Sequence, residues 1–565
     1  MDTPASAQLR RHLVRVLIYV LAVLLLLPGL TLIFVRHAID ELDGYSQLWQ
    51  FHVMGQAAQW ALAGGVAVLL FIVALGAVAF VNRRARYVSF VMGWALLRAA
   101  CVLAMLAQGV MLVWLSYWVG VFFFQIYVPK LIGLVGVAVA WAAYYAITGI
   151  FRRVPLGAVD GEPLKKPDAP ALWAHVQELA QKVGTAPPDH IVAGIDTSFF
   201  VTEAPLAVGA DLLKGRILFI SLPLLRILDT AEADGVLAHE LAHLRGGDSA
   251  SSAALGPKLL QYDQYAAMMG GYFTTRPVYY ILALYRMIFE FALQRDSRER
   301  EFMADQVAAN IVSPAAISHA LIKTTAYTAY RAQIEKQLAE HNKTYGTQLG
   351  IAQFVSDGLG DYAKSESFAA EIRQSQTPHP YDTHPLLAER MSHVNCPIAE
   401  SDYGAIVAQK PAHTWVDDIA TAADIEQRLW QKYEGIFSAQ HELDLACRYE
   451  PASVEEEAIV LKHFPPLVFT LKNGQRIEVN YAGLKLPDGK SLAWEDAGRI
   501  NLEDVPLRGE HMVIYAAKRK RLFYPKTSIK LKKFAGKEEI EKFKQAVGMY
   551  RQRDQMMRAY HEHHE

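Results

Sequence analysis

Two histidines and a glutamate stand close together in the stretch ADGVLAHELAHLRGGDS, which runs from 233 to 249. His239 and His243 are four residues apart, and Glu240 directly follows the first of them, which gives the pattern H-E-x-x-H. On a helix, residues at this spacing project from one face, one turn apart. Two imidazoles on one face can bind a metal ion, and the neighbouring carboxylate can take a proton from a metal-bound water. The pattern therefore predicts a metal site suited to hydrolysis.

A catalytic zinc site needs a third protein ligand and one open position for water. The stretch RDSREREFMADQVAAN, from 295 to 310, provides Glu301 and Asp305, four residues apart on a second expected helix. Glu301 could complete a His/His/Glu site. Asp305, or Asp248 after the first helix, could accept the ring N–H of a ligating histidine and fix its orientation. The alternative is that these charged residues form a solvated helix face. When they are considered together with the histidine pair, the metal site is the favoured interpretation.

Three motifs occur in a fixed order: VLAHELAHLRGGD, then REREFMADQVA, then THPLLAERM from 383 to 391. These motifs and their order resemble those of the CAAX prenyl-protease and HtpX-like family of membrane zinc metallopeptidases. The resemblance covers about residues 170–394 of this chain. The resemblance implies a mainly α (α+β) zincin-like peptidase domain that holds one Zn²⁺ per chain. That family often carries Asn-Ala-Phe on the strand lining its cleft, where this chain has Thr197, Ser198 and Phe199.

The same resemblance assigns roles to individual side chains. It implies a zinc-ligand set of His239, His243 and Glu301. Glu240 would be the general base, with Asp305 behind the ligands. His384 and Arg390 would lie near the scissile carbonyl, where a donor besides the metal is needed for the oxyanion.

The first 155 residues contain four stretches without charge, at 16–35, 57–81, 99–128 and 131–151. Each has about 20 residues or more, enough to cross a hydrocarbon core roughly 30 Å thick. Basic clusters precede the first stretch and follow the second and fourth, whereas the first loop is acidic. Basic residues flanking spans favour the cytoplasmic side. We therefore expect a multi-pass protein of the bacterial inner membrane with both ends of this region, and the peptidase domain, in the cytoplasm.

A fifth apolar stretch, at 278–293, precedes Glu301 and includes Arg286 and Glu290. These two charges make a full crossing costly. A single crossing would also place the two halves of the metal site on opposite sides of the membrane. We expect a long helix that leads to Glu301 and rests against the membrane.

The expected organisation is a membrane domain (1–155), a zinc metallopeptidase domain (156–400), a helical linker region (401–460) and a C-terminal module (461–565). In the module, Asn473-Gly474 and Asp488-Gly489 are hairpin signals between short β-like runs, and a helix closes the chain. This order is similar to a pleckstrin-homology-like domain by pattern only. The basic stretch at 518–533 could bind anionic headgroups, or it could be a solvated strand face.

Composition narrows the classes of function. The net charge of −1 gives no general electrostatic case for nucleic acid. Three distant cysteines argue against a disulfide framework and against a thiolate zinc site. Nearly uncharged spans disfavour a transporter. The sequence predicts a zinc endopeptidase in the bilayer that acts on proteins or peptides, membrane proteins included. The alternative is a membrane-anchored, non-catalytic adaptor that binds lipid or protein through its C-terminal module.

Overall fold

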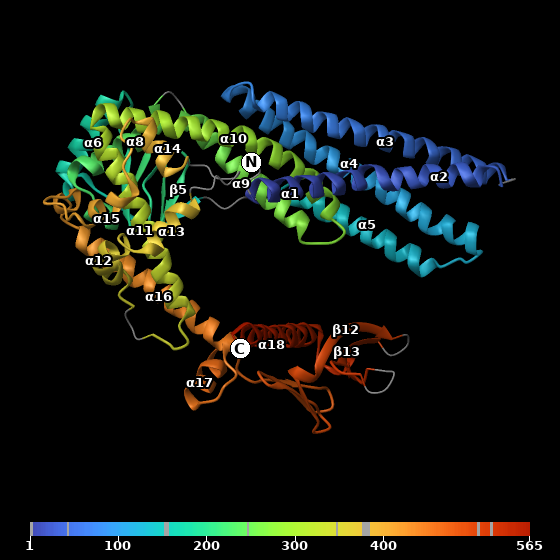
Figure 1. Ribbon diagram of the computed structural model, residues 1–565. Helices are drawn as coiled ribbons and strands as arrows, with labels where there is room; N and C mark the ends of the chain where they lie inside the picture. The colour runs from blue at the N-terminus through green and yellow to red at the C-terminus, as the bar shows by residue number, and fades with distance from the viewer. Residues whose placement is uncertain are drawn as a thin grey trace. The chain divides into compact units, whose positions relative to one another are not determined.

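The computed structural model describes residues 4–41, 44–151, 157–245, 248–345, 349–375, 385–505, 509–519 and 524–564. The chain divides into two compact units. Unit 1 comprises Met1–Arg331 and Val355–Leu429, and unit 2 comprises Ala332–Phe354 and Trp430–Glu565. Figure 1 shows the elements of both. The four domain boundaries expected from the sequence stay predictions.

The N-terminal part of unit 1 is built of long apolar helices. They are α1 (Pro4–Leu21), a π-helical turn (Ala22–Leu26), α2 (Leu27–Ile39), α3 (Tyr45–Ala79), α4 (Arg83–Phe124) and α5 (Pro129–Gly149). Within the described chain, four segments are long and apolar enough to cross a membrane: Arg11–Ile39, Gln47–Ala79, Arg84–Phe124 and Pro129–Gly149. This confirms the four apolar spans. Helix α4 begins well before the charge-free stretch at 99–128, and the Asn82 side chain caps it by accepting a hydrogen bond from the Ala85 amide at 2.8 Å.

A helical hairpin follows the H-E-x-x-H motif. It consists of α9 (Asp248–Gly270) and α10 (Arg276–Ile311). The Tyr262 hydroxyl donates to the Leu282 carbonyl at 2.5 Å, and Arg286 donates to Asp263 at 3.0 Å. One helix thus carries both the apolar stretch at 278–293 and Glu301, as expected.

The inner face of this hairpin packs into one core with the apolar helices. Buried members from the hairpin include Tyr262, Leu282, Tyr285 and Phe289, and those from the spans include Val20, Ile72, Phe90 and Trp94. The chain enters this core along α9 and returns along α10. A single crossing would separate the two halves of the metal site, but a hairpin does not, because both of its ends lie on the same side of the membrane.

The part of unit 1 that carries the H-E-x-x-H motif is mainly helical with two small sheets. The larger has the order β2-β3-β7-β4, with β3 and β7 parallel and the other pairs antiparallel. Its strands are β2 (Gly161–Leu164), β3 (His190–Gly194), β7 (Ile217–Ser221) and β4 (Phe200–Thr202). The smaller sheet has the order β1-β5-β6, formed by Gly157–Val159, Leu206–Val208 and Asp211–Leu213. Strand β7 is buried along its whole length, which explains the apolar run from Ile217 to Ile220.

Further helices belong wholly or partly to unit 1. They are α6 (Pro170–Val183), α7 (Leu222–Ile227), α8 (Thr230–His243), α11 (Pro314–Glu340), α12 (Ile351–Tyr362), α13 (Glu366–Ser375), α14 (Leu387–His393), α15 (Glu400–Ala408) and α16 (Ala422–Arg448). Two short 3₁₀ turns, Lys166–Asp168 and Trp415–Asp418, connect them. Helices α8 and α10 pack against each other. This contact brings the two motif-bearing helices together.

Unit 2 contains two antiparallel sheets and a long terminal helix. One sheet has the order β11-β10-β9-β8, from Ser491–Ala493, Gly483–Lys485, Arg476–Asn480 and Leu467–Thr470. The other has the order β12-β13-β14, from Ala497–Val505, Gly509–Ala516 and Lys526–Lys530. Helix α17 (Val454–His463) precedes them, and α18 (Lys537–His564) closes the chain (Figure 1).

Both expected hairpin turns of unit 2 are present. Gly474 and Gly489 have φ angles of +79° and +81°, a region that glycine enters without steric cost. The flanking strands pair antiparallel on either side of each turn. One core joins the two sheets to α18, through residues such as Phe469, Ile514 and Phe543. The likeness to a pleckstrin-homology domain stays a prediction.

Candidate metal centre

Helix α8 is fixed at its start before it presents any ligand. Asp229 caps it: its side chain accepts from the Glu232 amide at 2.8 Å, and Glu232 accepts from the Asp229 amide at 2.9 Å. Glu232 also accepts a 2.7 Å hydrogen bond from the Lys323 ammonium, which reaches across from α11. Glu232 and Lys323 are each 2% exposed. A buried ion pair therefore ties the first turn of α8 to α11.

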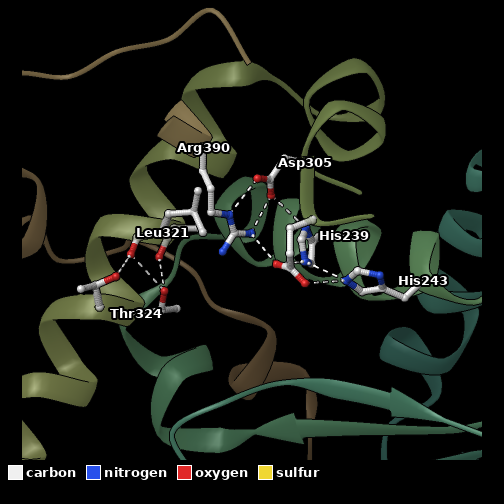
Figure 2. Close-up of polar contacts among 9 residues, drawn as sticks. His239, His243, Asp305, Leu321, Thr324 and Arg390 are labelled. Atoms are coloured by element: carbon white, nitrogen blue, oxygen red, sulfur yellow. Dashed lines mark hydrogen bonds and ion pairs between the residues drawn. The ribbon is translucent and has the colours of Figure 1, made fainter. Parts of the chain in front are cut away.

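The two histidines occupy the last turn of α8 and face each other. His239 is buried, and His243 is the final residue of the helix. Their Nε2 atoms are 3.1 Å apart, and the rings stand nearly perpendicular, at 88°. Glu240 lies beside them, half-buried. The helix thus presents two imidazole nitrogens to one point (Figure 2).

Glu301 reaches the same point from α10. Its Oε2 is 3.6 Å from His239 Nε2, and its Oε1 is 3.5 Å from His243 Nε2. His239, His243 and Glu301 each offer one donor atom, all within 4.8 Å of one another, so the group can hold a metal ion. Ligand atoms of a tetrahedral zinc at 2.0–2.1 Å would be about 3.3 Å apart. The observed donor separations fit that geometry.

Asp305 lies directly behind His239. Its Oδ1 is 2.9 Å from His239 Nδ1, on the side of the ring away from the other ligands. Asp305 is fully buried and Glu301 is 6% exposed. The alternative of a solvated charged face is therefore wrong for these two residues.

Arg390, from α14, completes the buried group. Its Nε and one terminal nitrogen donate to the two oxygens of Asp305 at 2.8 and 2.7 Å, and it lies 3.6 Å from Glu301 Oε2 (Figure 2). Burial opposes ionisation of Asp305, but the hydrogen bonds from Arg390, together with the nearby His239, outweigh it and hold the pKa of that carboxyl well below its usual range. Asp305 is thus a carboxylate at neutral pH.

The electrostatics of His243 also suit a ligand. Burial, followed by the neighbouring His239, lowers the pKa of His243 to about 3, although Glu301 opposes the change. The imidazole is neutral at pH 7. A neutral imidazole has a lone pair available for a metal.

The structure brings most of the expected site residues together, and two side chains lie outside its description. His384 falls in a stretch outside the described residues. Asp248 begins α9, but its side chain is outside the described part of the chain. Sequence reasoning missed Lys323, which no motif marks because its partner is distant in sequence. The Thr197–Phe199 segment directly precedes β4, at the edge of the sheet.

The fold and this group of side chains define a class, a mainly helical domain with candidate metal ligands on two packed helices. In agreement, residues 168–398 match the family model for peptidase family M48. The match contains α8, α10 and α14 and thus all the residues of the group.

Several similar proteins are each named Protease HtpX homolog. The one from Thermococcus kodakarensis is 30% identical over 196 residues, which is 32% of this chain and 64% of the relative. The one from Acaryochloris marina is 30% identical over 208 residues, 34% of this chain and 66% of the relative. The one from Gemmatimonas aurantiaca is 27% identical over 219 residues, 36% of this chain and 74% of the relative. No solved structure matches significantly.

Proposed function

We propose that this protein is a membrane-embedded zinc endopeptidase that hydrolyses peptide bonds in proteins or peptides, membrane proteins included. The observation that carries the proposal is the convergence of the His239, His243 and Glu301 donor atoms, with Asp305 held behind them. The match of residues 168–398 to the model of peptidase family M48 supports it, as do the four apolar helices.

Zinc suits the donor set best. Two imidazole nitrogens and one carboxylate oxygen are typical of catalytic zinc sites, which keep a fourth position open for water. No thiolate belongs to the group, and the donor spacing fits a tetrahedral ion. When bound, the metal supplies Lewis-acid chemistry and lowers the pKa of a coordinated water toward neutrality.

Glu240 is the proposed general base. It follows His239 directly and is half-buried, so its carboxylate can reach a water at the site without being a ligand. It would accept the proton of the attacking water and deliver it to the leaving amine. It therefore acts on the reacting atoms, whereas its two histidine neighbours hold the metal.

Asp305 and Arg390 are proposed as positioning residues. With its Nδ1–H directed at Asp305, His239 keeps the lone pair of Nε2 directed at the other ligands. The resemblance placed Arg390 at the scissile carbonyl, but its bidentate bonds to Asp305 favour a role behind the ligands. His384 stays the candidate donor to the oxyanion.

Metal analysis tests the ligand assignment. Protein purified in detergent should contain about one zinc per chain, and His239→Ala should contain almost none, because two ligands hold zinc poorly. Removal of the last five residues, HEHHE, is the matched control for adventitious binding and should leave the zinc content unchanged. Stoichiometric zinc in His239→Ala would refute the assignment.

A further inference from the structure

Unit 2 carries a cluster of basic side chains at one edge of its three-stranded sheet. The stretch from 511 to 537 holds nine lysines and arginines and no aspartate or glutamate, in a chain whose net charge is only −1. Seven of these residues are described and exposed. We call them the basic surface: Lys518, Arg519, Lys526, Lys530, Lys532, Lys533 and Lys537.

Buried apolar neighbours hold the basic surface in place. In β14, Lys526 and Lys530 are exposed, whereas Ile529 points into the core and is 6% exposed. Beyond the strand, Leu531 and Phe534 are each 1% exposed and flank Lys532 and Lys533. Lysines and anchors thus alternate along a fixed backbone. The charges are therefore displayed by ordered structure.

The ends of the basic surface are also tied to the sheet. The Arg519 guanidinium lies over the Tyr524 ring, 5.1 Å from its centroid, which links the two ends of the β13–β14 connection. Lys472, at the β8–β9 turn, donates to the Lys532 carbonyl at 3.0 Å. This contact adds another exposed cation beside the second end.

No carboxylate neutralises these cations within the described residues: none of the seven forms an ion pair. Other exposed lysines of unit 2 do. Lys485, Lys490 and Lys542 bind Glu478, Asp488 and Glu538 at 2.9, 3.0 and 2.8 Å. The basic surface therefore retains a concentrated positive charge for a partner outside the unit.

Lysines on an edge strand can also prevent pairing between sheets of different molecules. That role accounts for Lys526 and Lys530 in β14. It does not account for Lys532, Lys533 and Lys537, which follow the end of the strand. The cations continue from strand β14 through the following turn to the start of α18, and such an extended run fits an extended anionic partner.

We propose that the basic surface binds anionic lipid headgroups of the membrane that holds the apolar helices. Among the described residues after Gly149, no further helix qualifies as a span. In the predicted orientation, unit 2 is therefore on the cytoplasmic side of the membrane, where the anionic lipids of that leaflet attract clustered lysines and arginines. The tether to the spans raises the effective concentration of headgroups, so weak individual contacts suffice. Exposed Tyr524 suits the same interface, where tyrosine is enriched.

Hydrogen exchange of the full-length protein in lipid nanodiscs tests the proposal without relying on peptidase activity. One disc contains phosphatidylcholine only, and the other also contains phosphatidylglycerol. At low salt we expect exchange across 524–537 to slow about fivefold or more in the anionic discs, the effect of roughly one lysine contact. High salt should remove the difference, because the contacts are screened.

A pair of matched variants separates the basic surface from general charge. Lys526→Gln/Lys530→Gln/Lys533→Gln should abolish the protection. Lys485→Gln/Lys490→Gln/Lys542→Gln loses the same charge from ion-paired positions and should retain it. Thermal melts of both variants check folding.

One result would overturn the proposal, and a further measurement would then identify the kind of partner. Equal exchange in both kinds of disc at low salt would show that the membrane charge is not sensed. Equal exchange in the discs combined with protection by added polyglutamate would assign the surface to an acidic protein. Protection in the anionic discs that the first triple variant removes would support the proposal.

Discussion

A guanidinium with two parallel hydrogen bonds to one carboxylate holds the back of the candidate metal site. Arg390 binds both oxygens of Asp305, and Asp305 lies 2.9 Å from the ring of His239. Such planar, paired bonding is specific to arginine, and lysine cannot reproduce it. We therefore propose that Arg390 orients His239 through Asp305 without being a metal ligand itself.

Arg390→Lys should weaken zinc binding by about 10–100-fold, the cost typical of disturbing partners behind metal ligands. Competition with a chelator on purified protein measures this. Arg298→Lys is the matched control, since Arg298 also joins α10 to α14, through Glu389 at 2.6 Å. Its zinc affinity should not change. Reduced kcat with unaltered zinc affinity in Arg390→Lys would instead return Arg390 to the scissile carbonyl.

At the scale of elements, α8 can present its histidines because both of its ends are fixed. The capping box and the Glu232–Lys323 pair secure its start, and packing against α10 secures the turn with the ligands. The contacts that fix α8 thus also fix the positions of its two candidate ligands, His239 and His243.

Lys323→Met should lower the melting temperature in detergent, because it leaves the Glu232 carboxylate buried without its cation, a loss of about 3–5 kcal/mol. Glu232→Gln/Lys323→Met should recover much of that loss, since no charge is then buried. Lys336→Met, at an exposed pair of the same helix, should change stability little. A double variant less stable than the single one would contradict this account.

A feature could be predicted from the sequence when the residues that form it are close together in the chain. The H-E-x-x-H helix and the Glu301–Asp305 spacing are local patterns, so both the ligand set and its second helix could be predicted. The Glu232–Lys323 pair could not, because its partners are 91 residues apart and neither belongs to a motif. The α9–α10 hairpin was also missed in part. Its charges, such as Asp263 and Arg286, conceal an apolar face that only packing against the spans reveals.

At the scale of the whole molecule, the predicted orientation in the membrane would decide on which side the proposed peptidase meets its substrates. The basic residues around 83–86 and before the first span, against the acidic first loop, predict four passes with the peptidase part in the cytoplasm. The α9–α10 hairpin keeps this arrangement possible, since it returns the chain to its side of entry.

Reporter fusions after residues 45, 90 and 160 should read outside, inside and inside. The expectation follows from the four apolar helices and from the basic residues at their ends. A fusion after residue 260, in α9, tests the hairpin. Because the hairpin does not cross the membrane completely, we do not expect this reporter to be located outside. An outside reading after 160 would contradict the cytoplasmic peptidase.

The central claim, hydrolysis with Glu240 as the base, is tested most directly by proteolysis in detergent or liposomes with and without a zinc chelator. Glu240→Gln keeps the shape of the side chain and removes the proton acceptor, whereas His239, His243 and Glu301 still hold the metal. Zinc content should equal that of the wild type. Cleavage of an unfolded or membrane-protein substrate should fall by about 10²–10⁴-fold, the usual contribution of a general base. The account would be contradicted if the wild type and Glu240→Gln cleaved the substrate at the same rate. It would also be contradicted if the zinc-loaded wild type cleaved no substrate, and either result would favour a membrane-anchored adaptor.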